Sequence, residues 1–329
     1  REKIKIMKRP LNVGIAGYGV IGKIRHKFCD LHQGLRVIGL CDVAFHNDET
    51  SIPGIKKFNK PEQLLELPLD VLFVCLPNYL AAKTTIMGLK NGLHVFCEKP
   101  PGRSLSDLRD VIAVENKHPN QRLMYGFNHR FHDSVKDAME IISSQRLGDV
   151  VDLRGVYGKS KIIKFDSSEW RTQRNKAGGG ILLDQGIHMV DMMRMFAGEF
   201  TSVHSFVKNE FWGHDVEDNA YALMQTSTGK VAILHSSATQ WRHRFQLDIT
   251  LTKGALVLSG ILSNSRSYGA ETITIVYAED DGNGDPKEET IRYNKDNSWA
   301  DEIRTFFDLI EKGHKVEASS SSDALKTME

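Results

Sequence analysis

A glycine-rich segment near the N-terminus has the spacing needed to hold a dinucleotide. Gly17-Tyr18-Gly19-Val20-Ile21-Gly22 fits the pattern GxGxxG, between an apolar strand-like run and a helix-compatible run. In that setting the first glycine permits a tight turn, the second lets a pyrophosphate approach the backbone, and the third lets the helix pack closely on the strand. The string alone is weak, because a purely structural glycine turn has the same appearance.

Asp42 lies 20 residues after Gly22, directly behind the second apolar run. A carboxylate at this place accepts hydrogen bonds from the adenosine ribose hydroxyls and repels a 2′-phosphate. No Lys or Arg follows Asp42 before Lys56. The sequence therefore favours NAD over NADP.

Glu98-Lys99-Pro100 follows the apolar run 94–97. This places it at a carboxyl end of the expected parallel sheet, the edge where open α/β sheets bind ligands. Lys99 could hold a substrate hydroxyl and exchange a proton with it, and Glu98 could tune the lysine or contact the nicotinamide ribose. A solvated Glu-Lys pair before a proline turn is the alternative.

Asp184 and His188 are four residues apart, in an apolar segment that follows Gly178-Gly179-Gly180. In a helix this spacing puts both side chains on one face. A histidine oriented by a carboxylate is a common general base near neutral pH. A capping Asp beside a satisfied buried His is the alternative, and a metal site is disfavoured because the pair supplies only two ligands.

The surrounding pattern predicts the elements that position these residues. Short apolar runs alternate with helix-compatible stretches up to about residue 125, which indicates a parallel sheet covered on both faces. The second half has one strongly apolar helix, 181–196, and many β-branched, alternating segments. We expect an α/β fold: a Rossmann dinucleotide-binding domain over residues 1–125, then an α+β domain over 126–329 with a large, mainly antiparallel, open-faced sheet.

Composition narrows the function class. The 329 residues carry 43 Lys and Arg against 42 Asp and Glu, a net charge of +1. This balance argues against nucleic-acid binding as the main task, and no apolar run approaches the ~20 residues of a membrane span. Four cysteines lack zinc or CxxC spacing. We expect a cytoplasmic enzyme with a small-molecule substrate, no nucleic-acid or membrane partner and no metal.

Five motifs in order resemble one family: GIAGYGVIG, Leu76-Pro77-Asn78, CEKP at 97–100, GFNHRF at 126–131 and AGGGILLDQGIHMVD at 177–191. Over essentially its whole length the chain is similar to the glucose–fructose oxidoreductase / inositol 2-dehydrogenase (Gfo/Idh/MocA) family. The glycine loop adds little specificity to this resemblance. The combination of EKP with GGG-x3-D-x3-H adds most.

The resemblance implies an NAD(P)-dependent dehydrogenase or reductase that acts on the CH–OH group of a sugar or polyol. It implies that Lys99 binds and polarises the substrate hydroxyl and that His188 is the general base. It also implies that Asp184 orients the substrate and His188. The cofactor residues it implies are Gly17, Tyr18, Gly19, Val20, Ile21, Gly22, Asp42, Leu76, Pro77, Asn78, Glu98 and Lys99. The substrate residues it implies are Lys99, Asn128, Arg130, Trp170, Arg171, Asp184 and His188.

A basic stretch before the three glycines bears on the substrate. Its cations are Lys159, Lys161, Lys164, Arg171, Arg174 and Lys176, opposed only by Asp166 and Glu169. Clustered cations near Trp170 suit an anionic substrate such as a nucleotide-activated or acidic sugar. A solvated basic loop with no ligand is the alternative.

Two other functions fit the same motifs. One is an NAD-dependent, redox-neutral glycoside hydrolase, which would return its hydride and accumulate no NADH. The other is a non-catalytic NAD-binding regulator, which would need no proton-handling residues. Because the second half has few helices to cover a broad sheet, we also expect a homodimer or homotetramer.

Overall fold

The computed structural model describes residues 9–45, 52–160, 170–263, 265–278 and 285–329. The chain divides into two compact units: the first contains the N-terminal part up to Gly126 together with Trp299–Glu329, and the second contains Phe127–Ser298. The sequence analysis assigned all of 126–329 to one domain. The last 31 residues instead group with the first unit, where Phe306 packs against Phe73 and Phe96.

The first unit alternates strands and helices. Its elements are β1 (Leu11–Ala16), α1 (Val20–Asp30), β2 (Leu35–Cys41), β3 (Lys56–Phe58), α2 (Pro61–Leu64), β4 (Val71–Val74), α3 (Asn78–Lys90), β5 (His94–Glu98), α4 (Leu105–Glu115), β6 (Leu123–Gly126), α8 (Ser298–Lys312, from Trp299 on) and α9 (Ser321–Met328).

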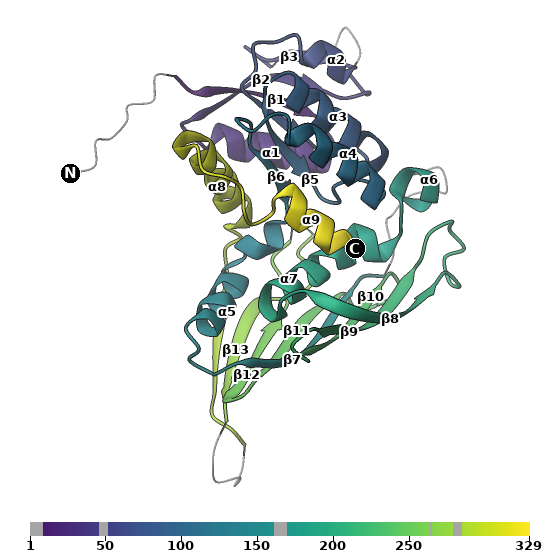
Figure 1. Cartoon of the computed structure of the whole chain (residues 1–329), viewed down its shortest axis with the longest axis vertical. Coiled ribbons are helices and arrows are strands. Elements are labelled where there is room, and N and C mark those ends of the chain that lie inside the picture. Colours follow the sequence, from purple (N-terminus) through teal and green to yellow (C-terminus); the bar gives the residue numbers. More distant parts are fainter. Residues whose placement is uncertain (1–8, 46–51, 161–169, 264, 279–284) are drawn as a thin grey trace, which may run out of the picture. The chain divides into compact units, whose positions relative to one another are not determined.

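The sheet of this unit has the strand order β3-β2-β1-β4-β5-β6, and its neighbouring strands are parallel. This is the order of a doubly wound dinucleotide-binding sheet. Successive strands are added on one side of β1 up to β3 and on its other side from β4 onward. Strands β4 and β6 are buried at every residue, as parallel strands covered on both faces must be. Figure 1 draws this sheet and helices α1 to α4 in purple to blue, and α8 and α9 in yellow.

Local signals explain where its helices begin. Ser104 caps α4, because its hydroxyl accepts a hydrogen bond from the Asp107 N–H. Ser320 caps the short C-terminal helix α9 in the same way, through the Asp323 N–H. The sequence analysis did not anticipate α9, because a serine run without a long apolar repeat follows a polar linker.

The second unit is built on a larger sheet. Its elements are η1 (Asn128–Phe131), α5 (Asp133–Ser143), β7 (Val150–Gly158), η2 (Trp170–Thr172), α6 (Arg174–Ala177), η3 (Leu182–Gly186), α7 (Ile187–Ala197), β8 (Phe200–Lys208), β9 (Asn219–Thr226), β10 (Val231–Ser237), β11 (Arg244–Leu251), β12 (Gly254–Ser259), β13 (Glu271–Tyr277) and β14 (Glu288–Tyr293).

Eight strands follow the order β14-β13-β12-β11-β7-β10-β9-β8. All neighbours are antiparallel except β7 and β10, so the expected mainly antiparallel sheet is confirmed. Helices α5 and α7 lie against this sheet (Figure 1), and alternate strand residues form the core with them. Strands β13 and β14 pair with each other, and residues 279–284 between them lie outside the described residues.

Two local features differ from the sequence prediction. The segment expected as one helix over 181–196 begins with a π-helical turn, η3, before α7 continues to Ala197. Strand β8 lacks a clear alternating pattern and is exposed along nearly its whole length, which is why sequence analysis missed it. Within the described residues, no helix has the length and apolarity to cross a membrane.

Candidate functional site

The three glycines of the loop are required for different structural reasons. Gly17 has a φ of +91°, and a Cβ there would lie 2.3 Å from the Cys75 carbonyl oxygen. A Cβ on Gly22 would lie 2.0 Å from the Gly17 oxygen, whereas one on Gly19 would meet no atom within 4 Å. The protein's own packing therefore demands Gly17 and Gly22 but leaves open space at Gly19, as expected where a pyrophosphate approaches the backbone.

The same loop orients Asp42, which follows β2. Its Oδ2 accepts a hydrogen bond from the Tyr18 N–H at 2.7 Å, and its Oδ1 accepts one from the Ala44 N–H at 3.0 Å. The Tyr18 hydroxyl lies 2.6 Å from His26 Nδ1, and its ring packs against Phe45. The carboxylate is thus fixed by backbone donors of the glycine loop and of the turn that follows β2.

The remaining cofactor candidates lie after β4 and β5. Leu76 and Pro77 are half-buried in the turn after β4, and Asn78 is the buried first residue of α3. Lys99 is half-buried directly after β5. Both segments stand at carboxyl ends of neighbouring parallel strands: β4, which lies next to β1, and β5, which lies next to β4.

Glu98 has a structural partner that the sequence did not reveal. Its Oε1 accepts a hydrogen bond from Arg25 Nε at 2.6 Å, and Arg25 Nη2 lies 2.6 Å from Glu302 Oε2. Arg25 is fully buried between the rings of Phe96 and Trp299. Burial alone would lower the pKa of Arg25, but the two carboxylates raise it above its ordinary value, so the guanidinium stays charged.

In the second unit, cations hold Asp184. Its Oδ2 lies 3.1 Å from Lys159 Nζ and its Oδ1 lies 3.7 Å from Arg171 Nε. Asp184 lies in the π-helical turn η3, and His188 is the second residue of α7. Among the residues that the structure describes, Asp184 thus lies between two cations.

His188 is only 4% exposed and is held by rings. Its imidazole stacks on that of His129, with centroids 3.7 Å apart and planes 13° apart. The Phe127 ring meets it edge-on. At the edge of the His129 ring, the Tyr157 hydroxyl lies 3.0 Å from Nε2. His188 therefore has a defined plane within unit two.

Two expected substrate residues have partners inside the protein. Arg130 makes a bidentate ion pair with the fully buried Asp191, with Nε 2.7 Å from Oδ2. Asn128 is 9% exposed and bonds to His129 and Ser298. The Asn128 side chain thus contacts His129 of the stacked pair, and the Arg130 side chain is held by Asp191.

The basic stretch is only partly described. Arg171 stacks over the Trp170 ring at 4.4 Å, and Arg174 binds both the carboxylate and the backbone oxygen of Asp215. The expected contributors Lys161, Lys164, Asp166 and Glu169 lie outside the described residues.

The sequence analysis did not single out Arg25, His129 or Tyr157. Arg25 is a charged residue in a helix, a type that is usually exposed, so no sequence pattern marks it as buried. His129 stands in the quoted GFNHRF motif, which was the one available signal. No group of three or more His, Cys, Asp or Glu side chains in the described parts of the chain is arranged to hold a metal ion.

Two family models match adjoining parts of the chain. The model "Oxidoreductase family, NAD-binding Rossmann fold" matches residues 11–127, and "GFO/IDH/MocA C-terminal domain" matches residues 135–257. Inositol 2-dehydrogenase of Rhizobium meliloti (strain 1021) is 26% identical over 96% of this chain and 93% of its own length. D-glucoside 3-dehydrogenase of Escherichia coli (strain K12) is 27% identical over 71% of this chain and 72% of its own.

Solved structures share the fold. A putative NADPH-dependent oxidoreductase from Desulfitobacterium hafniense DCB-2 superposes with a TM-score of 0.85 at 18% identity, covering 98% of this chain and 93% of that one. Levoglucosan dehydrogenase in complex with NADH gives 0.82 at 20% identity, covering 97% and 94%. With the nucleotide-binding sheet, the open-faced sheet and both family models in agreement, the chain belongs to the Gfo/Idh/MocA family of oxidoreductases.

Proposed function

We propose that this protein is an NAD-dependent dehydrogenase that transfers a hydride between nicotinamide and a secondary hydroxyl or ketone of a sugar-type substrate. The observation that carries the proposal is the arrangement of His188, a buried imidazole held flat against His129 four residues from an anchored carboxylate. A regulator that only senses NAD has no need of such a group. Sugar and polyol dehydrogenases among the relatives support the substrate class.

Each residue has a role in moving the hydroxyl proton. The Lys99 ammonium donates a hydrogen bond to the substrate oxygen and favours its negative charge. His188 takes the proton when C–OH becomes C=O, and Asp184 orients the substrate hydroxyls. When bound, NAD supplies the hydride acceptor. Gly19 and Asp42 would hold its pyrophosphate and adenosine ribose, which favours NAD over NADP.

Turnover of variants tests these roles. We expect Lys99→Ala and His188→Ala each to lower kcat by at least about 100-fold, because general acid–base work is lost, while NAD still binds. NADH formation at 340 nm and calorimetric NAD binding measure the two effects. Near-normal turnover in either variant would remove that residue's role. NAD binding without NADH formation from any sugar, but with glycoside release, would favour the redox-neutral hydrolase.

We propose that the substrate is anionic, such as a nucleotide-activated or acidic sugar. The two cations beside Asp184, Lys159 and Arg171, and the Trp170 ring beneath Arg171 support this choice. Arg171→Ala should raise KM about 10-fold for an anionic sugar and leave KM for a neutral polyol unchanged. Arg174→Ala is the matched control, since Asp215 already engages that guanidinium. Equal KM values in Arg171→Ala and wild type would exclude an anionic preference.

We propose a homo-oligomer, a dimer or a tetramer, that covers the outer face of the large sheet. Phe206, Tyr221, Leu223 and Ile233 are 40–75% exposed on β8, β9 and β10. The strand register places Tyr221 opposite Phe206 and Leu223 opposite Ile233, so the four form a continuous apolar patch. Light scattering of wild type and Leu223→Glu gives the test. A monomeric wild type would rule the oligomer out.

A further inference from the structure

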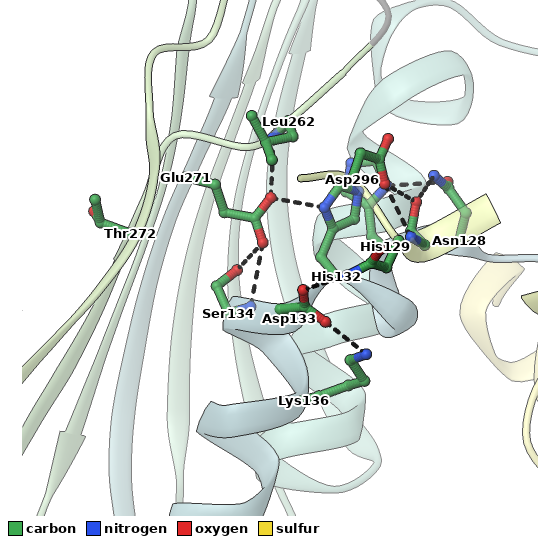
Figure 2. A network of polar contacts seen from close by, with 12 residues as sticks. Asn128, His129, His132, Asp133, Ser134, Lys136, Leu262, Glu271, Thr272 and Asp296 are labelled. Carbon is green, nitrogen blue, oxygen red and sulfur yellow. Dashed lines mark hydrogen bonds and ion pairs between the residues drawn. The ribbon is translucent and has the colours of Figure 1, made fainter. Parts of the chain in front are cut away.

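A directed chain of hydrogen bonds ends on His129 (Figure 2). The chain starts at Asp296 Oδ1, which accepts a hydrogen bond from the Ser298 hydroxyl at 2.6 Å. Because the Ser298 hydroxyl hydrogen is used in the bond to Asp296, the Ser298 oxygen acts as an acceptor. It accepts a hydrogen bond from the Asn128 side-chain N–H at 3.4 Å. The Asn128 amide is therefore oriented with its nitrogen toward Ser298 and its oxygen toward His129.

That orientation fixes the proton on His129. Asn128 Oδ1 lies 3.2 Å from His129 Nδ1 and can only accept, so Nδ1 must carry the hydrogen. On the other side of the ring, the Tyr157 hydroxyl lies 3.0 Å from Nε2. Burial raises the pKa of Tyr157 well above its ordinary value, so the phenol keeps its proton and donates it to Nε2. Both ring nitrogens are then satisfied in the neutral imidazole.

A neutral His129 has a direct consequence for His188. The two rings lie face to face with centroids 3.7 Å apart, and the exposed fractions of the two residues are 7% and 4%. Two imidazolium ions at this distance repel each other strongly in a buried setting. If His129 has no reason to take a proton, the pair can accept one at His188 without that repulsion.

We propose that His129 is a positioning residue, locked as the neutral Nδ1–H tautomer by Asn128 and Tyr157, that fixes the plane of His188 and leaves the proton to it. This inference rests on the proposed function, because it assigns the general base to His188. His129 touches neither hydride nor substrate in this role and acts through the stack alone.

Other titratable groups around the pair are engaged with each other. The ring of His132 lies 5.4 Å from that of His129, but its Nδ1 bonds to Glu271 at 2.8 Å. The groups on the elements around the two rings are Arg130 on η1, His132 directly after η1, Tyr157 on β7, Asp184 on η3, Asp191 on α7 and Glu271 on β13. Tyr268 packs on Tyr157, and burial raises the pKa of Tyr268 to about 12.

Nitrogen-15 spectra of the full-length protein with labelled histidines test the tautomer directly. We expect His129 to show a protonated Nδ1 and an unprotonated Nε2 throughout about pH 5.5–8.5, with its signals assigned by their loss in His129→Phe. The measurement is made on the wild-type chain and needs no activity. An Nε2–H tautomer, or a ring that titrates in this range, would overturn the proposal.

Tyr157→Phe sharpens the test, because it removes only the oxygen that donates to Nε2. The variant should let His129 take up a proton within the same pH range. Tyr268→Phe is the matched control, a second buried tyrosine next to Tyr157, and should leave the His129 signals unchanged. A His129 that stays neutral in Tyr157→Phe, or changes equally in both variants, contradicts the assignment.

Kinetics separate positioning from simple support of the fold. His129→Phe keeps a flat ring beneath His188 and should lower kcat by no more than about threefold, whereas His129→Leu should lower it about 10-fold with KM for NAD unchanged. Equal losses in the two variants would show that the stack does not matter. If His188→Ala kept full turnover, the proposed function would fail while the His129 tautomer stood; a wrong tautomer beside an inactive His188→Ala would remove only the present inference.

Discussion

The glycine loop and the histidine site obtain fixed geometry by different means. In the loop, backbone atoms meet so closely that side chains cannot be added: the Gly17 and Gly22 positions leave less than 2.5 Å for a Cβ. Around His188, the backbone is helical, a π-helical turn followed by α7, and stacked rings and buried hydrogen bonds give the precision. The glycine loop therefore does not tolerate an added side chain at Gly17 or Gly22. The histidine site should tolerate a ring of similar shape better than the loss of a stacking or hydrogen-bonding partner.

A methyl group on Gly22 should have the largest effect. Its Cβ would meet the Gly17 oxygen at 2.0 Å, so Gly22→Ala should yield little or no folded protein. Gly19→Ala is the control, because its Cβ has open space. It should keep Tm within about 2 °C and weaken NAD binding by about 10-fold or more. Thermal melts and NAD titrations measure both, and a destabilised Gly19→Ala would break the distinction.

Glu271→Gln should have the next largest effect, on stability. Glu271 accepts hydrogen bonds from His132, Ser134 and the Leu262 N–H (Figure 2). Burial alone would raise the pKa of this carboxyl, but those bonds lower it below its ordinary value. Breaking the buried pair should cost about 3 kcal/mol in the free energy of unfolding near pH 7.

The sign of the pH dependence follows from the lowered pKa. Ionised Glu271 stabilises the fold above its unfolded pKa of about 4.3, and this stabilisation is lost as pH falls through the lower folded value. The gap between wild type and Glu271→Gln should therefore narrow in acid, as urea unfolding at several pH values would measure. Glu289→Gln, which alters an exposed pair with Lys287, should leave stability unchanged. A constant gap would contradict a charged Glu271.

Asp42→Ala should have the smallest of these effects. Asp42 shares features of both sites, because it is a side chain whose position is fixed by backbone N–H groups. Removing its charge leaves Lys57 beside Phe45 and Lys23 over Tyr18. The ratio of kcat/KM for NADP to that for NAD should rise about 10-fold. An unchanged ratio would take Asp42 out of the ribose role.

Features that depend on the backbone were open to prediction from the sequence. The strands β1, β2, β4 and β5 coincide with apolar runs in the sequence. The GxGxxG spacing and the Ser104 cap are also local signals. Strand β8 and the π-helical turn η3 were missed, because exposure on both faces and a single extra residue per turn leave no hydrophobic period. The grouping of Trp299–Glu329 with the first unit depends on contacts far apart in sequence.

The candidate site divides in the same way. Asp184 and His188 could be placed on one helix from their spacing, yet the partners of Asp184, Lys159 and Arg171, come from separate segments. Nothing local marks Arg130 for Asp191 or Glu98 for Arg25, because both pairs form only when distant elements pack. The charge of Arg130 and of Glu98 therefore does not reveal that each has a partner inside the protein.

The burial of Arg25 has a consequence for synthesis on the ribosome. Arg25 is translated before the second unit, whereas its partner Glu302 and the covering Trp299 are translated after it. Until α8 arrives, a nascent nucleotide-binding unit has only Glu98 to balance a guanidinium destined for a fully buried place, and it lacks Phe306 over Phe73 and Phe96. The packing of the nucleotide-binding unit around Arg25 can therefore be completed only after the intervening unit, Phe127–Ser298, has been synthesised.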